Sequence, residues 1–155
     1  MRVDTRYEFE AVFRAFAQLQ ALQRQGRDLM RPIAGVLADR AEDAFADEAD
    51  PETGRPWTAL SQAHRRRRQR QGYDGPLLQM KGLLAGSLST EYGDNHAVAG
   101  SAMIYATIHQ FGGKAGMAPG PAAVPARPFL GIGNEGERAI ARIIKKALSN
   151  ALDAR

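Results

Sequence analysis

Cysteine is absent from this 155-residue chain, and aromatic residues make up only 7% of it. Without cysteine the protein has no disulfide bonds, no thiolate ligands for a metal ion and no cysteine nucleophile. With so few aromatic rings, the core must be mainly aliphatic. The missing disulfides are compatible with a reducing compartment, and we expect synthesis in the cytoplasm.

Long apolar runs are missing as well, because no segment approaches the roughly 20 residues that cross a bilayer. The N-terminal segment carries Asp4, Glu8 and Glu10 and lacks the basic-then-apolar pattern of a signal peptide. We therefore expect no membrane association. At this length we expect one domain over residues 1–155, with a single core and appended arms.

The charge is modest in total but uneven along the chain. The 21 basic and 17 acidic residues give a net charge of +4, which by itself does not identify a nucleic-acid-binding protein. The charged residues of segment 39–52 are all acidic except Arg40, and an arginine run follows at Arg65, Arg66, Arg67, Arg68 and Arg70. Two interpretations are open: opposite patches that join neighbouring copies head to tail, or two solvated faces.

Apolar spacing predicts two helices in the N-terminal third. Phe9, Val12, Phe13, Phe16, Leu19 and Leu22 recur at three- and four-residue steps, which predicts an amphipathic helix from Thr5 to Arg24. An interruption is expected over residues 27–32, since Pro32 suits the first turn of a new helix. That second helix runs into the acidic segment.

A turn is expected over residues 50–56, where proline, glycine and aspartate are concentrated. Trp57 follows it, and a lone tryptophan in such a place more often closes the edge of a core than recognises a ligand. Ser61 can cap a short helix that carries the arginine run. Successive helical residues lie about 100° apart, so these arginines cannot all contact one surface.

The middle of the chain predicts a hairpin between two short helices. The apolar residues of segment 77–84 suggest a helix, and Leu88, Thr90 and Tyr92 alternate with polar residues before Gly93-Asp94-Asn95 and Val98. This is typical of two antiparallel strands. A further helix is expected from Ser101, with Ile104, Ile108 and Phe111 on one face, ending at Gly112-Gly113.

Residues 112–125 are rich in glycine, alanine and proline, which predicts a flexible loop. An extended edge strand is expected from Arg127 to Ile132. Asn134 and Glu137 have the spacing of a helix cap, and the apolar residues from Ile140 to Leu152 form a helical stripe. The predicted fold is α+β: a small antiparallel sheet packed against N-terminal helices and a C-terminal helix, with a long flexible loop.

The sequence patterns of common catalytic sites are absent. There is no His-Glu-x-x-His pair and no Gly-x-Ser-x-Gly elbow, and a metal site would rest on His64, His96 and His109 alone. We therefore expect no enzymatic activity, no metal and no cofactor. The arginine run can bind phosphates, but no aromatic residues are interleaved with it to stack bases, so such binding would not depend on sequence.

Four ordered blocks nevertheless form a recognisable pattern between about Leu19 and Leu148. They are Phe45 with Asp50-Pro51 and Gly54-x-x-Trp57-x-x-Leu60-Ser61; Leu78 with Gly82-Leu83 and Ser87-Leu88; Tyr105-Ala106-x-x-His109-Gln110-Phe111-Gly112-Gly113; and Pro125-Ala126-Arg127-Pro128-Phe129-Leu130-Gly131. With these blocks the chain resembles the bacteriophage virion morphogenesis (tail completion) family of Mu-like and related tailed phages.

The resemblance implies a small structural protein that acts in many identical copies where the capsid neck meets the tail tube. Tail-terminator and neck proteins of this kind typically form rings, most often hexamers, and have no catalytic residues to carry over. The implied partners are copies of the same chain, tail-tube proteins and neck or connector proteins. Genomic DNA in the ring lumen is a further possible contact, and the implied location is the tail or neck of the virion.

We expect subunit or partner contacts at a set of aromatic and charged residues within these blocks: Trp57, Tyr105, His109, Phe111, Arg127, Pro128 and Phe129. Tyr105 and His109 lie one helical turn apart, and Arg127 places a planar donor group beside an aromatic residue. Core packing of Phe129 and a structural, hydrogen-bonded His109 are the competing interpretations. The arginine run is expected to face DNA, a neighbouring subunit or solvent.

Two other functions are open at this point. The first is a basic module that binds DNA phosphates without sequence preference and is not part of a virion; its binding would depend on salt and on residues 65–68. The second is a small hydrolase with an unrecognised site, in which His109→Ala would abolish turnover.

Overall fold

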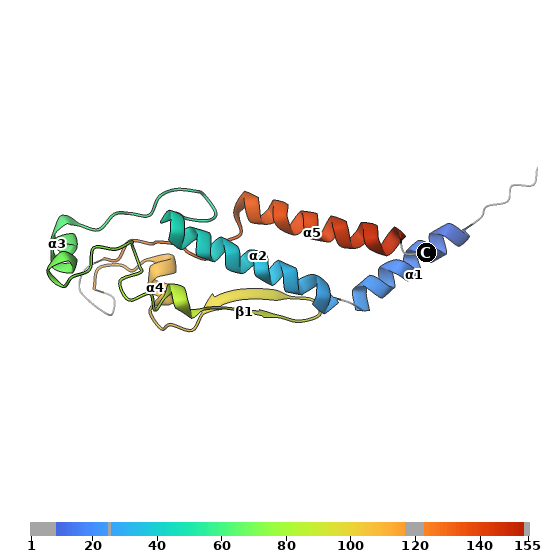
Figure 1. Ribbon diagram of the computed structural model, residues 1–155, viewed down its shortest axis with the longest axis horizontal. Helices are drawn as coiled ribbons and strands as arrows, with labels where there is room; N and C mark the ends of the chain where they lie inside the picture. The colour runs from blue at the N-terminus through green and yellow to red at the C-terminus, as the bar shows by residue number, and fades with distance from the viewer. Residues whose placement is uncertain (1–8, 25, 117–122, 154–155) are drawn as a thin grey trace, which may run out of the picture.

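A computed structural model gives the fold and describes residues 9–24, 26–116 and 123–153. It contains α1 (Glu10–Arg24), α2 (Gly26–Asp47), α3 (Gln62–Arg70), a 3-10 turn η1 (Ala85–Ser87), β1 (Leu88–Tyr92), β2 (Ala97–Ser101), α4 (Ala106–Phe111) and α5 (Gly133–Asp153) (Figure 1). The predicted α+β class is confirmed. Residues 5–8 of the first predicted helix lie outside the described residues, and the remainder is α1.

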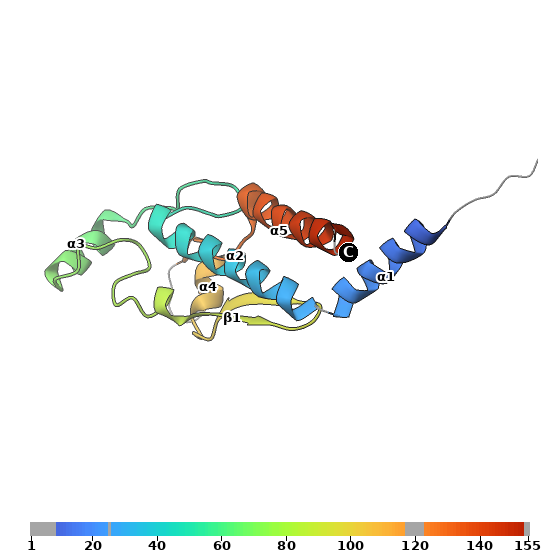
Figure 2. The same cartoon turned by 45° about the vertical axis from the view of Figure 1, so that its right-hand side comes forward.

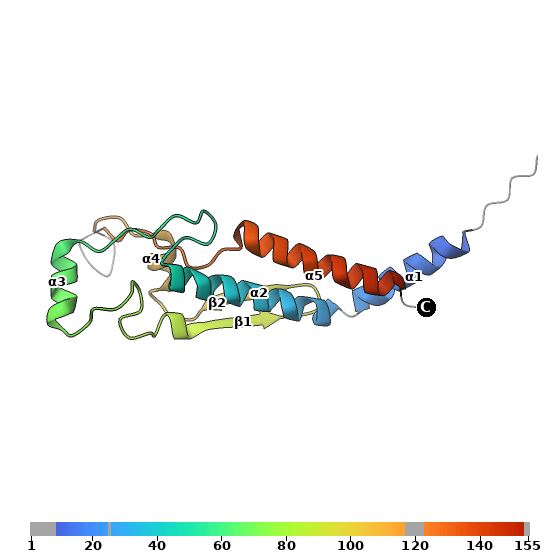
Figure 3. The ribbon, with the colours of Figure 1, turned by 45° about the horizontal axis from the view of Figure 1, so that its top comes forward.

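The long helix α2 runs through the middle of an elongated molecule. Both strands pack against α2 on one side, and α5 lies along it on the other (Figures 1 and 2). Helix α1 contacts α5 and projects beyond the rest of the chain, whereas α3 lies at the opposite end (Figure 3). The two ends of the molecule therefore carry different elements.

The predicted hairpin is confirmed. Strands β1 and β2 pair antiparallel, with Thr90 opposite Ala99 and Tyr92 opposite Ala97. The turn closes through a hydrogen bond from the Gly93 amide to the His96 carbonyl oxygen. Gly26 at the start of α2 packs on this turn so closely that a Cβ there would collide with the Asp94 carbonyl oxygen.

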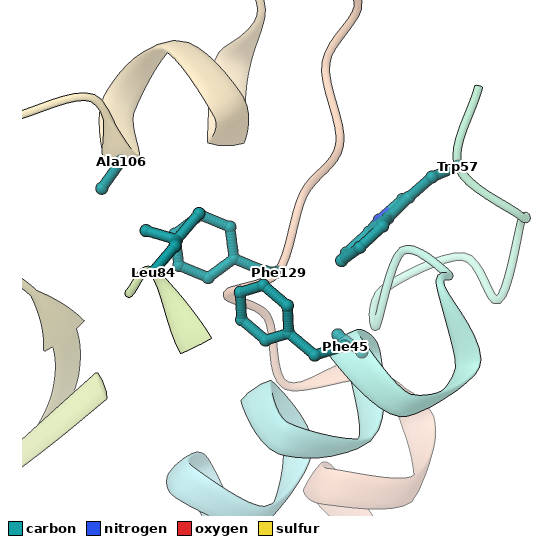
Figure 4. Packing of buried hydrophobic residues seen from close by; sticks show 6 residues of the cluster. Phe45, Trp57, Leu84, Ala106 and Phe129 are labelled. Atoms are coloured by element: carbon teal, nitrogen blue, oxygen red, sulfur yellow. The ribbon is translucent and has the colours of Figure 1, made fainter. Parts of the chain in front are cut away.

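The core sits where the C-terminal end of α2 meets the loops around α4. Phe45 packs edge-on against Trp57, with ring centroids 5.7 Å apart, and its ring lies 5.3 Å from that of Phe129 (Figure 4). Leu84 and Ala106 close the cluster. Phe129 has no exposed surface, so this small aromatic group is the centre of the fold despite the low aromatic content.

The predicted interruption over residues 27–32 is wrong, because α2 already begins at Gly26 and contains Pro32. The contacts of the first turn explain this. The Arg27 guanidinium lies 5.4 Å from the centre of the Tyr92 ring, and Gly26 is held against the hairpin turn. These contacts fix a helical start before the proline, whose exposed ring does not disturb the core.

The helix predicted over residues 77–84 is also wrong: the chain forms turns there. Leu78 and Gly82 have φ angles of 58° and 66°, outside the right-handed helical region. Two hydrogen bonds between side chains and backbone hold the segment to the C-terminal end of α2 instead. Glu48 Oε1 accepts a hydrogen bond from the Leu77 amide, and Gln79 Nε2 donates to the Phe45 carbonyl.

The helix expected from Ser101 begins only at Ala106, so the prediction placed its start too early. Strand β2 extends through Ser101, whose hydroxyl accepts a hydrogen bond from the Met103 amide. Ile104, expected on the packed face, is 96% exposed. The predicted end is confirmed: Gly112 is the C-cap, with a φ of 76°.

Segment 127–132 is extended but forms no strand, contrary to the prediction. Its backbone groups bond to side chains of other segments in place of a neighbouring strand. The predicted cap at Asn134 is wrong as well, because α5 begins at Gly133 and Asn134 lies within its first turn. At this end of the helix, Glu52 Oε1 accepts a hydrogen bond from the Ile132 amide.

The loop of residues 112–125 is closed at its base, where Gly113 and Val124 exchange two backbone hydrogen bonds. Its middle, residues 117–122, lies outside the described residues, so the predicted flexible loop is described only in part.

Candidate assembly interface

Gln110 connects α4 to the extended segment that follows the loop. Its Oε1 accepts hydrogen bonds from the Phe129 and Leu130 amides, both at 3.0 Å, and its Nε2 donates to the Leu130 carbonyl at 2.9 Å. One side chain thus takes the place of a strand partner for this segment. Gln110 belongs to one of the four sequence blocks, but no pattern in the sequence indicated this role.

Trp57 and Phe129, both predicted contact residues, are buried within the chain. Trp57 is 6% exposed, and its indole nitrogen donates to the Pro128 carbonyl oxygen at 2.7 Å. Pro128 is half-buried. The core interpretations of Trp57 and Phe129 are thus confirmed, and all three residues join the loop after α2 to the segment before α5.

Arg127 is 5% exposed and ties the same segment to two others. Its Nε donates to the Thr58 carbonyl oxygen at 2.9 Å, and its backbone amide donates to the His109 carbonyl at 2.7 Å. Burial lowers the pKa of the Arg127 guanidinium, and the charge of Glu48 opposes that change. The Arg127 side chain is therefore buried and hydrogen-bonded inside the subunit.

His109 lies against Tyr105, with ring centroids 6.0 Å apart and nearly perpendicular planes. Its Nδ1 is buried and has no hydrogen-bond partner among the described residues. Burial, and then the nearby charge of Arg127, lower the pKa of His109. Both effects favour the neutral imidazole, so the ring is held as a packing group against a cation.

The arginine run divides into one anchor and four exposed residues. Ser61 caps α3 as predicted, accepting a hydrogen bond from the His64 amide. Arg68 is 8% exposed, and its guanidinium donates to the carbonyls of Gly75 and Pro76. The others, Arg65, Arg66, Arg67 and Arg70, are exposed. The expectation that they cannot share one surface is confirmed.

An open groove of about 990 Å³ lies between α3, α4 and segment 78–84. Leu83 and Met80 line it and are 55% and 39% exposed, while Leu84 is buried at its base. Its charged lining residues are all cationic: Arg67, Arg68, Lys81 and Arg127. The largely neutral His109 also lines it. Phe111, at the end of α4, is 76% exposed but does not line the groove.

A second apolar surface lies at the other end of the molecule, on α1. We call it the α1 stripe: Phe9, Val12, Phe13, Phe16 and Leu19. Phe13 is 71% exposed and Phe16 61%. Nearby on α5, the predicted apolar stripe is only partly covered, since Ile144, Leu148 and Leu152 also remain more than one-third exposed.

The acidic segment forms a third surface, a groove of about 620 Å³ beside the turn at residues 50–56. Its acidic lining residues are Asp43, Asp47, Asp50, Glu52 and Glu135. Arg40 bridges two of these carboxylates, with Nη1 2.9 Å from Glu135 and 3.0 Å from Asp43. This bridge attaches the start of α5 to α2 and partly neutralises the patch.

The architecture and these surfaces can be compared with known proteins. A family model described as the phage virion morphogenesis family matches residues 7–149. The chain belongs to this family. Its role is therefore a structural or assembly role in the formation of a phage particle.

Individual relatives agree with the family assignment. The chain is 45% identical over 127 residues to the "Putative capsid assembly protein G" of Escherichia phage Mu, covering 81% of each sequence. It is 37% identical over 151 residues to "Mu-like prophage FluMu G protein 1" of Haemophilus influenzae, covering 96% of this chain and 97% of the relative. No solved structure matches the chain significantly.

Most residues of the four sequence blocks that were predicted to make subunit contacts pack inside the subunit instead of lying exposed on its surface. Of the predicted contact residues Trp57, Arg127 and Phe129 are buried, Tyr105, His109 and Pro128 are half-buried, and Phe111 is exposed. Their part in subunit contacts stays a prediction. Sequence reasoning missed the α1 stripe as a surface, because apolar periodicity marks a buried face without saying which molecule buries it.

Within residues 9–24, 26–116 and 123–153, no three or more histidine or carboxylate side chains gather where they could hold a metal ion. None of the helices in these ranges has the length and apolar character needed to cross a bilayer.

Proposed function

We propose that this protein is a structural component of the phage virion that forms a ring of identical copies, six in number, at the head–tail junction. There it completes the tail and joins it to the neck. Its partners are copies of itself, tail-tube proteins and neck or connector proteins. No bond is made or broken, because the function is supplied by association free energy.

The observation that carries this proposal is the exposed α1 stripe. Solvent-exposed aromatic side chains at helical spacing are unfavourable in a lone subunit, and large apolar patches usually mark interaction sites. The stripe therefore supports a protein whose final state is an assembly.

The family relationship supports the same role at a coarser level. The Mu relative carries the name of a capsid assembly protein, and the family as a whole is described by virion morphogenesis. A ring at the junction would contact both the head and the tail. This position therefore agrees with the relative's name, which refers to the capsid, and with a role in completing the tail.

The test is to count copies of this chain in purified particles and in isolated assembly intermediates by quantitative mass spectrometry. We expect a fixed number per particle that is a small multiple of the ring symmetry. A chain that stays monomeric in dilute solution does not contradict the proposal, because such rings can form only on the tail end. A chain absent from particles and from all intermediates would.

The four exposed arginines of α3 favour a second candidate, a module that binds DNA phosphates without sequence preference. This function predicts strong binding of the purified chain to free DNA that falls steeply with salt. Replacing Arg65, Arg66 and Arg67 with alanine should then abolish the binding. For the ring function we expect weak binding of the isolated chain, since the charges of several copies act together only around a ring axis.

A further inference from the structure

We propose that the α1 stripe of one copy packs into the groove between α3 and α4 of the next copy. This inference rests on the proposed function, since it names the contact that would build the ring. The occupant of the groove is thus a second copy of this chain, and the contact is head to tail.

The first support is that both surfaces are apolar and open in the single chain. The α1 stripe presents two phenyl rings, Phe13 and Phe16, that are more than half exposed. The groove presents Leu83 and Met80 above the buried Leu84. Packing the two apolar surfaces against each other would remove both from water, which is favourable.

The second support is their placement at opposite ends of the elongated molecule. Helix α1 projects from one end, whereas α3 lies at the other (Figures 1 and 3). Residues of α3 line the groove, so the groove lies at the α3 end. The stripe therefore cannot reach the groove of its own chain. A projection at one end and a groove at the other is the arrangement of a heterologous contact, which generates rings when the rotation between copies closes.

The third support is the area available. An aromatic side chain presents about 200 Å², so the exposed parts of the stripe amount to about 500 Å². Burying this surface against a similar area of the groove would remove on the order of 1,000 Å² from water. That is near the lower limit for a specific protein interface.

The fold also constrains the backbone beside the groove. Leu78, one of its lining residues, has a φ of 58°, an uncommon and strained conformation for leucine. The neighbouring Leu77 amide is fixed by the Glu48 carboxylate at 2.6 Å. A backbone kept in a costly conformation at the edge of a groove fits a binding surface better than an unconstrained loop.

Cysteine cross-linking tests this contact directly, because the natural chain contains no cysteine. The full-length double variant Phe13→Cys/Leu83→Cys is oxidised mildly in extracts of cells assembling the phage. Both positions are exposed, so the substitutions should not affect folding. We expect a ladder of dimers, trimers and higher species on a denaturing gel, because each copy is then linked to two neighbours.

Two controls define the result. The matched variant Phe13→Cys/Val98→Cys places the second cysteine on the hairpin at a similar exposure, 51%, and should give no ladder. The single variant Phe13→Cys should give no dimer; an efficient Phe13–Phe13 dimer would mean symmetric pairing of the stripes and would overturn the inference.

The same extracts separate this inference from the proposed function. If light scattering of unoxidised material shows a multimer while Phe13→Cys/Leu83→Cys forms no ladder, the contact is wrong and the ring function stands. If no multimer is found in extracts or particles, the ring function fails and the contact fails with it.

Discussion

Gln110 satisfies three backbone groups of a segment that has no strand partner. The variant Gln110→Leu has a side chain of similar size but leaves the two amides and the carbonyl without a hydrogen-bond partner. Each such loss costs about 1–3 kcal/mol when the group stays out of water. We expect chemical denaturation to show a loss of about 2–4 kcal/mol in the free energy of unfolding.

Gln110→Glu is the matched variant, because its carboxylate still accepts hydrogen bonds from the Phe129 and Leu130 amides. It replaces the bond donated to the Leu130 carbonyl with an unfavourable contact between two acceptor oxygens. It should cost clearly less than Gln110→Leu. Equal losses for the two variants would mean that the hydrogen bonds to the segment are not what stabilises it.

His109 predicts how stability depends on pH. Its pKa is lowered in the fold, first by burial and then by Arg127, so the unfolded chain binds more protons than the folded chain at mildly acidic pH. The stabilising contribution is complete above the unfolded pKa of about 6.5 and is lost as the pH falls below it towards the folded value.

Thermal denaturation from pH 8 to pH 5 checks this prediction. The natural chain should lose stability below about pH 6.5, and His109→Gln should lose less over the same interval. His96→Gln, at the exposed hairpin turn, should follow the natural chain. Identical pH profiles for the natural chain and His109→Gln would contradict the account of this residue.

Gly133 is required by the close approach of α5 to the turn at Pro51. Its φ is 59°, and a Cβ would collide with the Pro51 carbonyl oxygen. Gly133→Ala should therefore lower the free energy of unfolding by at least about 2 kcal/mol. Gly35→Ala, in the interior of α2 with open space around it, should raise it by up to about 1 kcal/mol. Denaturant titration of both variants decides the point.

At the scale of elements, the sequence predicts best what local chemistry decides. The hairpin, the Ser61 cap of α3 and the glycine end of α4 follow from turn residues and capping side chains, and all three are confirmed. The apolar stripes of α1 and α5 were equally readable as helices. Their packing was not, because a periodic pattern does not specify the surface that covers it.

The errors occurred where distant residues decide local structure. Contacts with the hairpin start α2 before Pro32, and Glu48 and Gln79 replace a helix with turns after residue 76. Gln110 likewise replaces the expected edge strand. Hydrogen bonds of this kind join residues about 20 to 35 positions apart, so no local pattern announces them.

Helix α3 gives a prediction at this scale, because its arginines differ in role. Arg68 anchors the helix to the carbonyls of Gly75 and Pro76, whereas Arg66 is exposed. Arg68→Ala should lower the free energy of unfolding by about 1–3 kcal/mol, and Arg66→Ala should change it by less than about 0.5 kcal/mol. Urea titration of the two variants measures the difference; equal effects would contradict the anchor role.

At the scale of the whole molecule, the exposed α1 stripe is the feature that a single subunit does not explain. The double variant Phe13→Ser/Phe16→Ser should leave the circular dichroism and the unfolding transition of the isolated chain nearly unchanged, since both rings are mainly exposed. The yield of assembled, infectious particles should fall at least tenfold, because the contact surface is lost.

Phe111→Ser is the matched control for that variant, since it removes an exposed phenyl ring outside the stripe and the groove. Its effect on particle yield should be smaller. If the α1 variant assembled normally while Phe111→Ser did not, the assembly surface would lie at the end of α4.

The most direct measurement is electron cryo-microscopy of intact particles in which this chain carries a label that can be located. The account predicts a closed ring of labelled copies where the head meets the tail. Labelled copies found only at another place in the particle, or as isolated single subunits at the junction, would contradict it.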